Sequence, residues 1–387
     1  MEKLKFLEKF TLNNKIEVPN RLVVAPLTLF ASNPDGTIND DEREYLKVRG
    51  TGIGLYILGA TAVNQEGLTF LGQPRALSEK DLPSLEERAK IIKSQGVLAI
   101  NQIHHGGLKA KFEYSGTAPL APSSEIADKL LKDSNSFDTP TKELTVDEIK
   151  KIIEGFGNAT ELSIKSGYDG IEIHGANNFL LQQFYSPYTN RRTDEWGGTE
   201  EKRMKFPLEV VDACCKAREK LNRPDFIIGY RLSPEEPYDT GLTMTETNHL
   251  IKALLTKPIQ YIHISQWNYF KKAHRGDGAG EERLKTIHNL TKEKVALIGV
   301  GGLLSEKDLS TAFDSGFSEF IGFGCASMIN KDLGILLKEN KGNQISLEID
   351  PEHPEKYSFP PVLWKMCCQG PGGILPIKGK PHKKLDL

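Results

Sequence analysis

The chain has 387 residues, of which 38% are hydrophobic and 26% are charged, a composition typical of globular proteins rather than disordered chains. Its formal net charge of -2 at pH 7 gives no reason to expect nucleic acid or an anionic membrane as a partner. No apolar segment approaches the roughly 20 residues that a membrane-spanning helix needs.

Eight apolar segments alternate with amphipathic segments along the chain. The strands are expected to begin near Leu22, Leu55, Val97, Gly170, Phe226, Tyr261, Val295 and Phe320. The helices are expected at residues 40–49, 85–94, 147–166, 202–221, 245–256, 282–289, 307–314 and 331–338. Strand and helix in regular alternation predict an α/β fold, a single (β/α)8 TIM barrel with a closed parallel sheet.

Two of these helices have clear start signals. Thr145 is followed three residues later by Glu148, and Thr243 by Glu246. This spacing is typical of a capping box, in which each side chain accepts a hydrogen bond from the other residue's backbone N–H. The two helices should therefore begin directly after the threonines.

Two additions to the barrel are expected. Residues 10–18 are predicted to form a hairpin that closes the bottom of the barrel. Residues 341–387 are rich in Pro, Gly and Lys and predict an irregular C-terminal extension, packed on the barrel of residues 1–340 or on a neighbouring subunit of a homo-oligomer. The long segments 104–144 and 266–281 interrupt the regular pattern, and loops of such length usually cover active sites.

The five cysteines are odd in number and contain no C-x-x-C pair, so reduced thiols are expected and no metal site is predicted. The amino terminus mixes charges of both signs with apolar residues and lacks the core of an export signal. We therefore expect a cytoplasmic protein that acts on small molecules.

The fourth predicted strand ends in a polar cluster. Ile171 and Ile173 are expected in a short buried strand, His174 follows them, and Asn177 lies three residues later. In a (β/α)8 barrel this is the face that holds the active site. His174 and Asn177 could donate two hydrogen bonds to one oxygen and so polarise a carbonyl or nitro group. The alternative is a core histidine followed by a helix cap.

The other strand ends extend this site. Gln102 ends the third strand and Arg231 the fifth, which would suit a planar heterocycle with acceptors along its edge. The alternative for Arg231 is an internal ion pair with Glu235 or Glu236. Glycine-rich loops after the last two strands have the chemistry of a phosphate site. We find no lysine at this face, which disfavours a flavin-free aldolase or isomerase.

Five segments resemble the old yellow enzyme family of FMN-dependent oxidoreductases. They are NRLVVAPLT at 20–28, GLYILGATAV at 54–63, INQIHHGG at 100–107, GYDGIEIHGAN at 167–177 and SPYTNRRTDEWGG at 186–198. The resemblance covers about residues 5–340, nearly the whole predicted barrel.

The resemblance implies the positions of the cofactor and of the reacting groups. The residues implied to hold FMN are Ala25, Pro26, Leu27, Thr28, Ala60, Gln102, Arg231, Gly301, Gly302, Gly324 and Cys325. Of these, Thr28 is also implied to tune the flavin, and the last four to hold its phosphate. His174 and Asn177 are implied to bind the electron-withdrawing oxygen of the oxidant.

The implied reaction is ping-pong: NADH or NADPH reduces FMN and leaves, and an activated alkene, a quinone or a nitro compound then takes the hydride. Two alternatives remain open. One is an NAD(P)H oxidase or flavin reductase that uses oxygen or free flavin. The other is a flavin-binding protein without significant turnover.

The chain departs from the family at three places. Phe179 stands where a tyrosine usually protonates the alkene, which favours quinones and nitro compounds as oxidants. Cys325 stands where an arginine commonly neutralises the FMN phosphate, which predicts weaker FMN binding. At the third place, Thr28 stands where one subgroup of the family has a redox-tuning cysteine, so thiol control of the flavin is not expected. Nearby, Phe30, where some members place a substrate-contacting tyrosine, should make the pocket more apolar.

Overall fold

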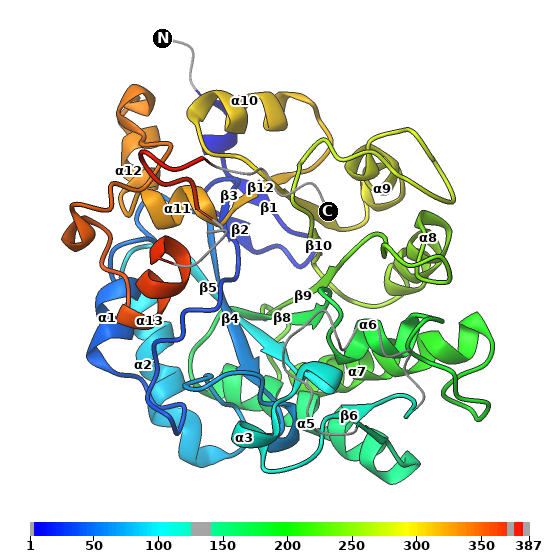
Figure 1. The fold of residues 1–387 in the computed structure, drawn as a ribbon. Coiled ribbons are helices and arrows are strands. Elements are labelled where there is room, and N and C mark those ends of the chain that lie inside the picture. The colour runs from blue at the N-terminus through cyan, green and yellow to red at the C-terminus, as the bar shows by residue number, and fades with distance from the viewer. Residues whose placement is uncertain (1–3, 125–140, 370–374, 382–387) are drawn as a thin grey trace.

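The computed structural model describes residues 4–124, 141–369 and 375–381. Eight parallel strands close into a barrel in the order β10-β11-β12-β3-β4-β5-β8-β9 (Figure 1). The strands are β3 (Leu22–Val24), β4 (Leu55–Ala62), β5 (Leu98–His104), β8 (Gly170–Gly175), β9 (Ile227–Leu232), β10 (Tyr261–Ile264), β11 (Ala296–Val300) and β12 (Phe320–Phe323). The predicted (β/α)8 barrel is confirmed.

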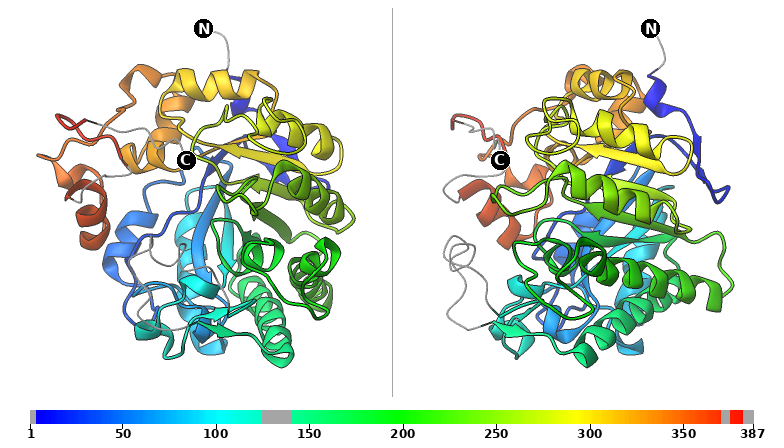
Figure 2. Two further views of the ribbon diagram at one scale, coloured as in Figure 1. Left: turned by 45° about the vertical axis from the view of Figure 1, so that its right-hand side comes forward. Right: turned by 90° about the vertical axis from the view of Figure 1, so that its right-hand side faces the viewer.

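Helices form a layer around the barrel (Figure 2). The eight predicted helices are α1 (Asp40–Leu46), α2 (Leu82–Lys93), α5 (Val146–Lys165), α7 (Glu200–Lys220), α8 (Met244–Leu254), α9 (Arg283–Thr291), α10 (Glu306–Asp314) and α12 (Leu333–Lys338). Short helices not expected from the sequence are α3 (Phe112–Ser115), α6 (Leu180–Tyr185) and α11 (Cys325–Ile329). The last two follow the carboxyl ends of β8 and β12.

The predicted caps begin their helices as expected. Thr145 accepts a hydrogen bond from the N–H of Glu148 at the start of α5, and Glu148 accepts one in return. Thr243 and Glu246 form the same reciprocal pair at α8. These pairs satisfy backbone donors that a helix start leaves without intrahelical partners.

The N-terminal hairpin covers the bottom of the barrel. Strands β1 (Phe10–Thr11) and β2 (Glu17–Val18) pair antiparallel. Nδ2 of Asn13 donates to the carbonyls of Ile259 at 2.9 Å and Lys294 at 3.1 Å, just before β10 and β11 begin. The right-hand view of Figure 2 shows the hairpin and the C-terminal extension on opposite sides of the molecule.

Apolar side chains fill the barrel and the space around it. A cluster that includes Val23, Ile100, Ile227 and Ile298 lies in the barrel interior, each at most 1% exposed. A second, larger cluster fills the layer between the strands and the helices. The interior is therefore a packed core that supports a site at one end.

The described part of the C-terminal extension contacts the barrel beside α1. It contains η5 (Gly342–Gln344), η6 (Pro354–Lys356), α13 (Pro361–Trp364) and a π-helix at Lys365–Gln369. The Phe359 ring lies 6.1 Å from that of Tyr45 on α1, and the Arg49 guanidinium lies 3.7 Å above the same tyrosine. The domain boundary at residue 340 and a role in oligomerisation stay predictions, and residues 370–374 and 382–387 lie outside the described part.

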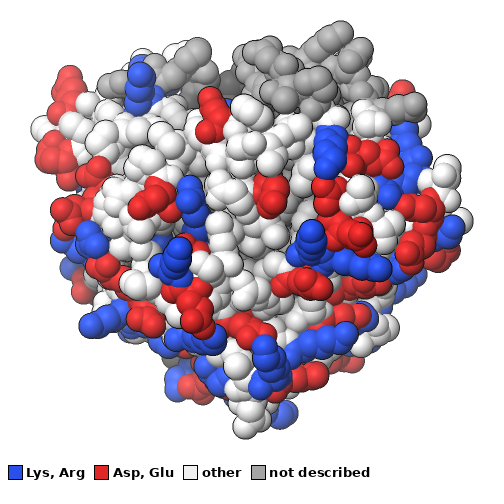
Figure 3. Space-filling model, turned by 90° about the horizontal axis from the view of Figure 1, so that it is seen from below, with Lys and Arg blue, Asp and Glu red and all other residues white. Residues whose placement is uncertain are grey.

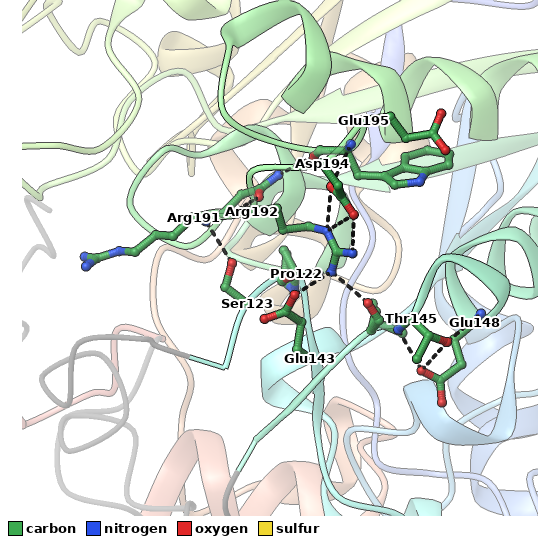
Figure 4. Close-up of polar contacts among 12 residues, drawn as sticks. Pro122, Ser123, Glu143, Thr145, Glu148, Arg191, Arg192, Asp194 and Glu195 are labelled. Carbon is green, nitrogen blue, oxygen red and sulfur yellow. Dashed lines mark hydrogen bonds and ion pairs between the residues drawn. The ribbon is translucent and has the colours of Figure 1, made fainter.

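The segment 186–198 anchors a pair of short strands, β6 (Leu120–Ala121) and β7 (Lys142–Glu143). Arg192 donates to the carbonyls of Pro122 at 2.9 Å and Leu144 at 2.7 Å, and it pairs with Asp194 (Figure 4). One buried guanidinium thus joins three parts of the chain. This segment of the resemblance has a structural role in the described structure.

Charged side chains of both signs intermingle on the face drawn in Figure 3. Some join helices, as where Lys220 on α7 pairs with Glu161 on α5 at 2.7 Å. Within the described residues, no helix combines the length and the apolar character needed to cross a membrane. The same residues contain no group of three or more His, Cys, Asp or Glu that could hold a metal ion.

Candidate active site

The carboxyl ends of the strands surround a cavity of about 920 Å³. Its walls come from the segments around the ends of β3, β4, β5, β8 and β9, and from residues 360–366 of the C-terminal extension. Many residues singled out in the sequence meet here, although they lie far apart along the chain. Those that line the cavity are Pro26, Leu27, Thr28, Phe30, Ala60, Gln102, His174, Asn177, Phe179 and Arg231.

The chain turns from the barrel into the cavity after β3. Ala25 still belongs to the barrel wall, because it is 6% exposed and its N–H donates to the carbonyl of Phe323 at 3.0 Å. Beyond it, Phe30 has a φ of 50° and packs edge-on against Phe70 at 5.1 Å. The two rings give this part of the wall an aromatic surface.

A close approach of backbone to side chain shapes the floor. The peptide bond between Gly59 and Ala60 is cis. A Cβ atom on Gly59 would lie 2.5 Å from Oε1 of Gln102, closer than real Cβ contacts come. Only glycine lets β4 run this near the Gln102 amide, which stands at the cavity.

Gln102 on β5 and Glu172 on β8 form a polar edge under the cavity. Nε2 of Gln102 donates to Glu172 at 2.7 Å, and Nδ1 of His263 lies 2.8 Å from the other carboxylate oxygen. Burial raises the pKa of Glu172, but His263 and Arg231 lower it by more, so the carboxylate is ionised at neutral pH. Because Nε2 of Gln102 is used, its Oε1 is the atom that remains to accept a hydrogen bond.

Arg231 places a buried cation at the same edge. The residue is 8% exposed, and its Nε atom has no hydrogen-bond partner among the described residues. Glu235 instead accepts from Arg283 at 2.6 Å, and Glu236 accepts from Ser186 at 2.6 Å. The alternative of an internal ion pair with either glutamate is therefore wrong. Burial lowers the pKa of Arg231, which still leaves the guanidinium charged.

His174 presents a hydrogen-bond donor to the cavity. Its Nδ1 atom accepts from the N–H of Ala176 at 3.3 Å, so the proton of the neutral ring resides on Nε2. Burial, and to a smaller extent the nearby Arg231 guanidinium, holds the pKa of His174 well below its usual value. The imidazole is neutral at pH 7 and acts as a donor rather than as a cation.

Asn177 supplies a second donor. Its Oδ1 accepts from the hydroxyl of Ser265 at 2.8 Å, and its backbone N–H donates to Ser233 at 2.9 Å. These contacts leave the Nδ2 amide group to donate, with no partner recorded in the described part of the chain. The helix-cap alternative is wrong for Asn177, because α6 begins at Leu180 with Phe179 as its N-cap residue.

Phe179 forms an aromatic wall with two histidines. Its ring meets the ring of His104 at 4.3 Å and that of His174 at 4.9 Å, both in edge-on geometry. Burial lowers the pKa of His104 to about 3, so this ring is also neutral. Phe179 lines the cavity with carbon and hydrogen only, and it has no proton to transfer.

Lys109 was missed in the sequence analysis, which expected no lysine at this face. It lines the cavity, donates to the carbonyl of Asn177 at 2.8 Å, and lies 5.1 Å above the centre of the Phe179 ring. It ends the 3₁₀ turn η4 (Gly107–Lys109), which folds back over the strand ends after β5. Gly107 permits this turn with a φ of 59°, and the Gly106-Gly107 pair is the signal that could have found it.

The glycine loops lie beside the cavity. Gly301 and Gly302 follow β11 with φ values of 133° and 66°, and Gly324 directly precedes Cys325 at the start of α11. None of these four residues lines the cavity, but a Cβ on Gly324 would lie 3.1 Å from Leu27, which does. The loop at 324–325 thus adjoins the cavity wall at Leu27.

The segment 266–281 contacts the first glycine loop instead of the cavity. The N–H of Tyr269 donates to the carbonyl of Gly301 at 2.9 Å, and a Cβ on Gly302 would lie 3.3 Å from the carbonyl of Trp267. The segment 104–144, in contrast, contributes Lys109 and its neighbours to the cavity wall. Both segments were expected to cover the site. Among the described residues, segment 104–144 lines the cavity and segment 266–281 does not.

The family model of the NADH:flavin oxidoreductase / NADH oxidase family matches residues 6–344. The chain belongs to this family, the old yellow enzymes. It is 38% identical to the probable NADH-dependent flavin oxidoreductase YqiG of Bacillus subtilis (strain 168), over 95% of this chain and 96% of the relative. The old yellow enzyme homologue of Zymomonas mobilis has the same fold, with a TM-score of 0.75, 23% identity, and coverage of 92% of this chain and 99% of that one.

Two further relatives are longer proteins. The NADH:fumarate oxidoreductase of Klebsiella pneumoniae (strain 342) is 33% identical over 93% of this chain, and the NADH:acrylate oxidoreductase of Vibrio harveyi is 32% identical over 93%. This chain spans 38% of the first and 35% of the second. Membership among the old yellow enzymes makes the protein an FMN-dependent oxidoreductase that uses NADH or NADPH, as the motifs implied.

The residues at the cavity fit FMN. The unused Nε donor of Arg231 and the free Oε1 acceptor of Gln102 lie along one edge, which matches a ring edge that has both acceptors and a donor. A Cβ on Gly324 would lie 3.1 Å from Leu27, so the loop at 324–325 adjoins the cavity wall. A cavity of about 920 Å³ also has room for a ring system and a second small molecule.

Proposed function

We propose that this enzyme reduces small electrophilic acceptors whose electron-withdrawing oxygen binds between His174 and Asn177. The observation that supports this most directly is the pair of donors, Nε2–H of His174 and the Nδ2 amide of Asn177, at one cavity. Two preorganised donors on one oxygen stabilise the negative charge that develops there during reduction. Candidate acceptors are activated alkenes, quinones and nitro compounds.

In this proposal FMN lies on the loop from Pro26 to Thr28 and on Ala60. Gln102 and Arg231 bind the edge of its ring, and the backbone of the glycine loops at 301–302 and 324–325 binds its phosphate. When bound there, FMN would supply the chemistry of hydride transfer from NADH or NADPH to the acceptor. The nicotinamide and the acceptor would use the same cavity in turn, which gives a ping-pong reaction.

The names of two relatives, an NADH:fumarate and an NADH:acrylate oxidoreductase, support alkenes with a carboxylate as one acceptor class. The cavity supports the same class, because three cations line it, Lys109, Lys111 and Arg231, against a single carboxylate, Asp41, among the described lining residues. An anionic acceptor would therefore enter a cavity of favourable charge.

An anaerobic half-reaction experiment tests the proposal. The FMN-loaded enzyme is reduced with NADH or NADPH, and the return of the flavin absorbance is followed after addition of a quinone, a nitroarene or an unsaturated acid. In His174→Ala, we expect reoxidation by these acceptors to slow by about 10²-fold, the usual effect of losing one such donor. His353→Ala, an exposed histidine of the extension, is the matched control.

Two results would contradict the proposal. One is rapid reoxidation by air together with no response to any of the three acceptors, which would point to an NADH oxidase. The other is reoxidation in His174→Ala at the rate of the control, which would show that the donor pair does not bind the acceptor.

A further inference from the structure

Lys109 has the position and the chemistry of an acid. Its Nζ atom lies 5.1 Å above the centre of the Phe179 ring and belongs to the wall of the cavity that holds His174 and Asn177. One of its three N–H donors goes to the backbone carbonyl of Asn177 at 2.8 Å. The ammonium group is therefore held at the acceptor site, with two N–H bonds left for another partner.

No carboxylate neutralises this cation. Among the described residues, Lys109 forms no ion pair, and its polar partner is a backbone carbonyl. Other lysines do form ion pairs, as Lys93 does with Asp169 at 2.8 Å. A lysine that is partly buried without a counterion is costly unless it is used. The contact with the aromatic face of Phe179 offsets part of that cost.

Other cavity groups are poorer acids. The rings of His104 and His174 are neutral, because burial lowers the pKa of each far below 7. Arg231 does not release its proton at physiological pH. Tyr114 lines the cavity, but its contact with the carboxylate of Glu113 raises the pKa of its hydroxyl. Burial shifts Lys109 the other way and lowers the pKa of its ammonium group, which makes it a stronger acid.

We propose that Lys109 delivers the proton that an activated alkene takes up on its α-carbon, the step for which Phe179 offers no hydroxyl. This inference rests on the proposed function, since it needs an alkene whose oxygen is held by His174 and Asn177. With Lys109 as the acid, alkenes no longer lack a proton donor at this site. Quinones and nitro compounds are protonated on oxygen and do not depend on this group.

The substrate of this step is an unsaturated acid or ketone. The β-carbon takes the hydride that the FMN chemistry supplies, and the π electron pair of the alkene moves toward the α-carbon and the carbonyl oxygen. That pair then forms a C–H bond with a proton of Lys109, while the electrons of the broken N–H bond stay on nitrogen. The neutral amine regains a proton from water, which reaches the partly exposed side chain.

The test compares two acceptors in the FMN-loaded enzyme. The reoxidation rate with an unsaturated acid is divided by the rate with a quinone, for the wild type and for Lys109→Met. We expect this ratio to fall by about 10²-fold or more, because a general acid contributes that much to a proton-dependent step. Quinone reoxidation and bound FMN absorbance show whether the variant is folded, and Lys109→Gln is the substitute if Lys109→Met does not fold.

Two further variants separate acidity from charge. Lys109→Arg keeps a cation but releases no proton, so its ratio should be nearly as low as that of Lys109→Met. Addition of Phe179→Tyr to Lys109→Met should restore alkene reduction by supplying a phenolic proton at the neighbouring position. Tyr114→Phe tests the competing acid, because it removes the phenol of this wall. The matched control is Lys90→Met, an exposed lysine of α2 outside the cavity lining, which should keep the wild-type ratio.

Several outcomes would overturn the inference. They are a wild-type ratio in Lys109→Met, full alkene reduction in Lys109→Arg, or a loss of alkene reduction in Tyr114→Phe. A wild-type enzyme that reduces quinones but no alkene would also overturn it, while leaving the proposed function intact. A wild-type enzyme that reduces neither acceptor would refute the proposed function itself.

Discussion

Arg192→Lys tests how far one guanidinium holds the wall beside the active site. Arg192 is 8% exposed and donates to the carbonyls of Pro122 at 2.9 Å and Leu144 at 2.7 Å. It also donates twice to Asp194, from Nε at 3.1 Å and from the terminal nitrogen at 2.6 Å. Its planar fork thus reaches two carbonyls and a carboxylate at the same time.

A lysine keeps the charge but cannot reproduce this geometry, because its ammonium group is a single point at the end of a flexible stem. We expect at least one buried carbonyl to lose its donor, which costs about 1–3 kcal/mol, and one charged hydrogen bond to be lost, which costs about as much. The free energy of unfolding should therefore fall by about 2–6 kcal/mol, which is large for a single substitution.

Equilibrium unfolding in urea, followed by tryptophan fluorescence, measures this difference. The matched control is Arg191→Lys, because the Arg191 side chain is exposed and points away from the cluster, while its backbone N–H donates to Ser123 at 2.8 Å (Figure 4). We expect the control to change stability by no more than about 0.5 kcal/mol, as is usual for surface substitutions. An equally small change in Arg192→Lys would refute the reasoning.

Three other predictions concern the barrel and the loops of the site. Gly301→Ala should weaken FMN binding and lower the melting temperature, because at a φ of 133° its Cβ would lie 2.6 Å from the backbone of Asn268. Unchanged binding in an FMN fluorescence titration would contradict this prediction. Arg88 is 0% exposed and donates to Glu42 at 2.7 Å. Glu42→Ala leaves this guanidinium as an unpaired buried charge, so the free energy of unfolding measured in urea should fall by about 3–5 kcal/mol. Burial lowers the pKa of His104 and of His105 to about 3, so only the unfolded state gains their protons as the pH falls below about 6.5, and stability should decrease from pH 6.5 toward pH 3. His105→Gln should make that decrease shallower, and an unaltered slope in urea titrations between pH 7 and pH 5 would contradict the assignment.

Most of the architecture could be predicted from the sequence, because it depends on local signals. The strand from Ile171 to His174 was recognisable from its two isoleucines, and the barrel places His174 at the face where sites form. The capping pair of Thr145 and Glu148 marked the start of α5, which the sequence placed at residue 147 and the structure at Val146. Predicted and observed helix bounds differ by no more than three residues, since periodicity and capping act within one or two turns.

The family and its chemistry could also be predicted from the sequence. The polar residues at the strand ends, Gln102, His174 and Arg231, line one cavity in the structure, and the family model confirms the resemblance that they suggested. Parallel strands bring their carboxyl ends together, so a list of strand ends is already a list of neighbours. Their individual roles stay predictions until variants are measured.

What the tertiary structure alone decided is how side chains far apart in sequence share partners. Glu235 and Glu236 lie near Arg231 in the chain, yet both bond elsewhere, which leaves the Arg231 Nε donor unused at the cavity. Lys109 reaches Phe179 only because the turn after β5 folds back across the strand ends. Sequence patterns record the period and the ends of each element, whereas the direction of a loop depends on all the surfaces that it packs against.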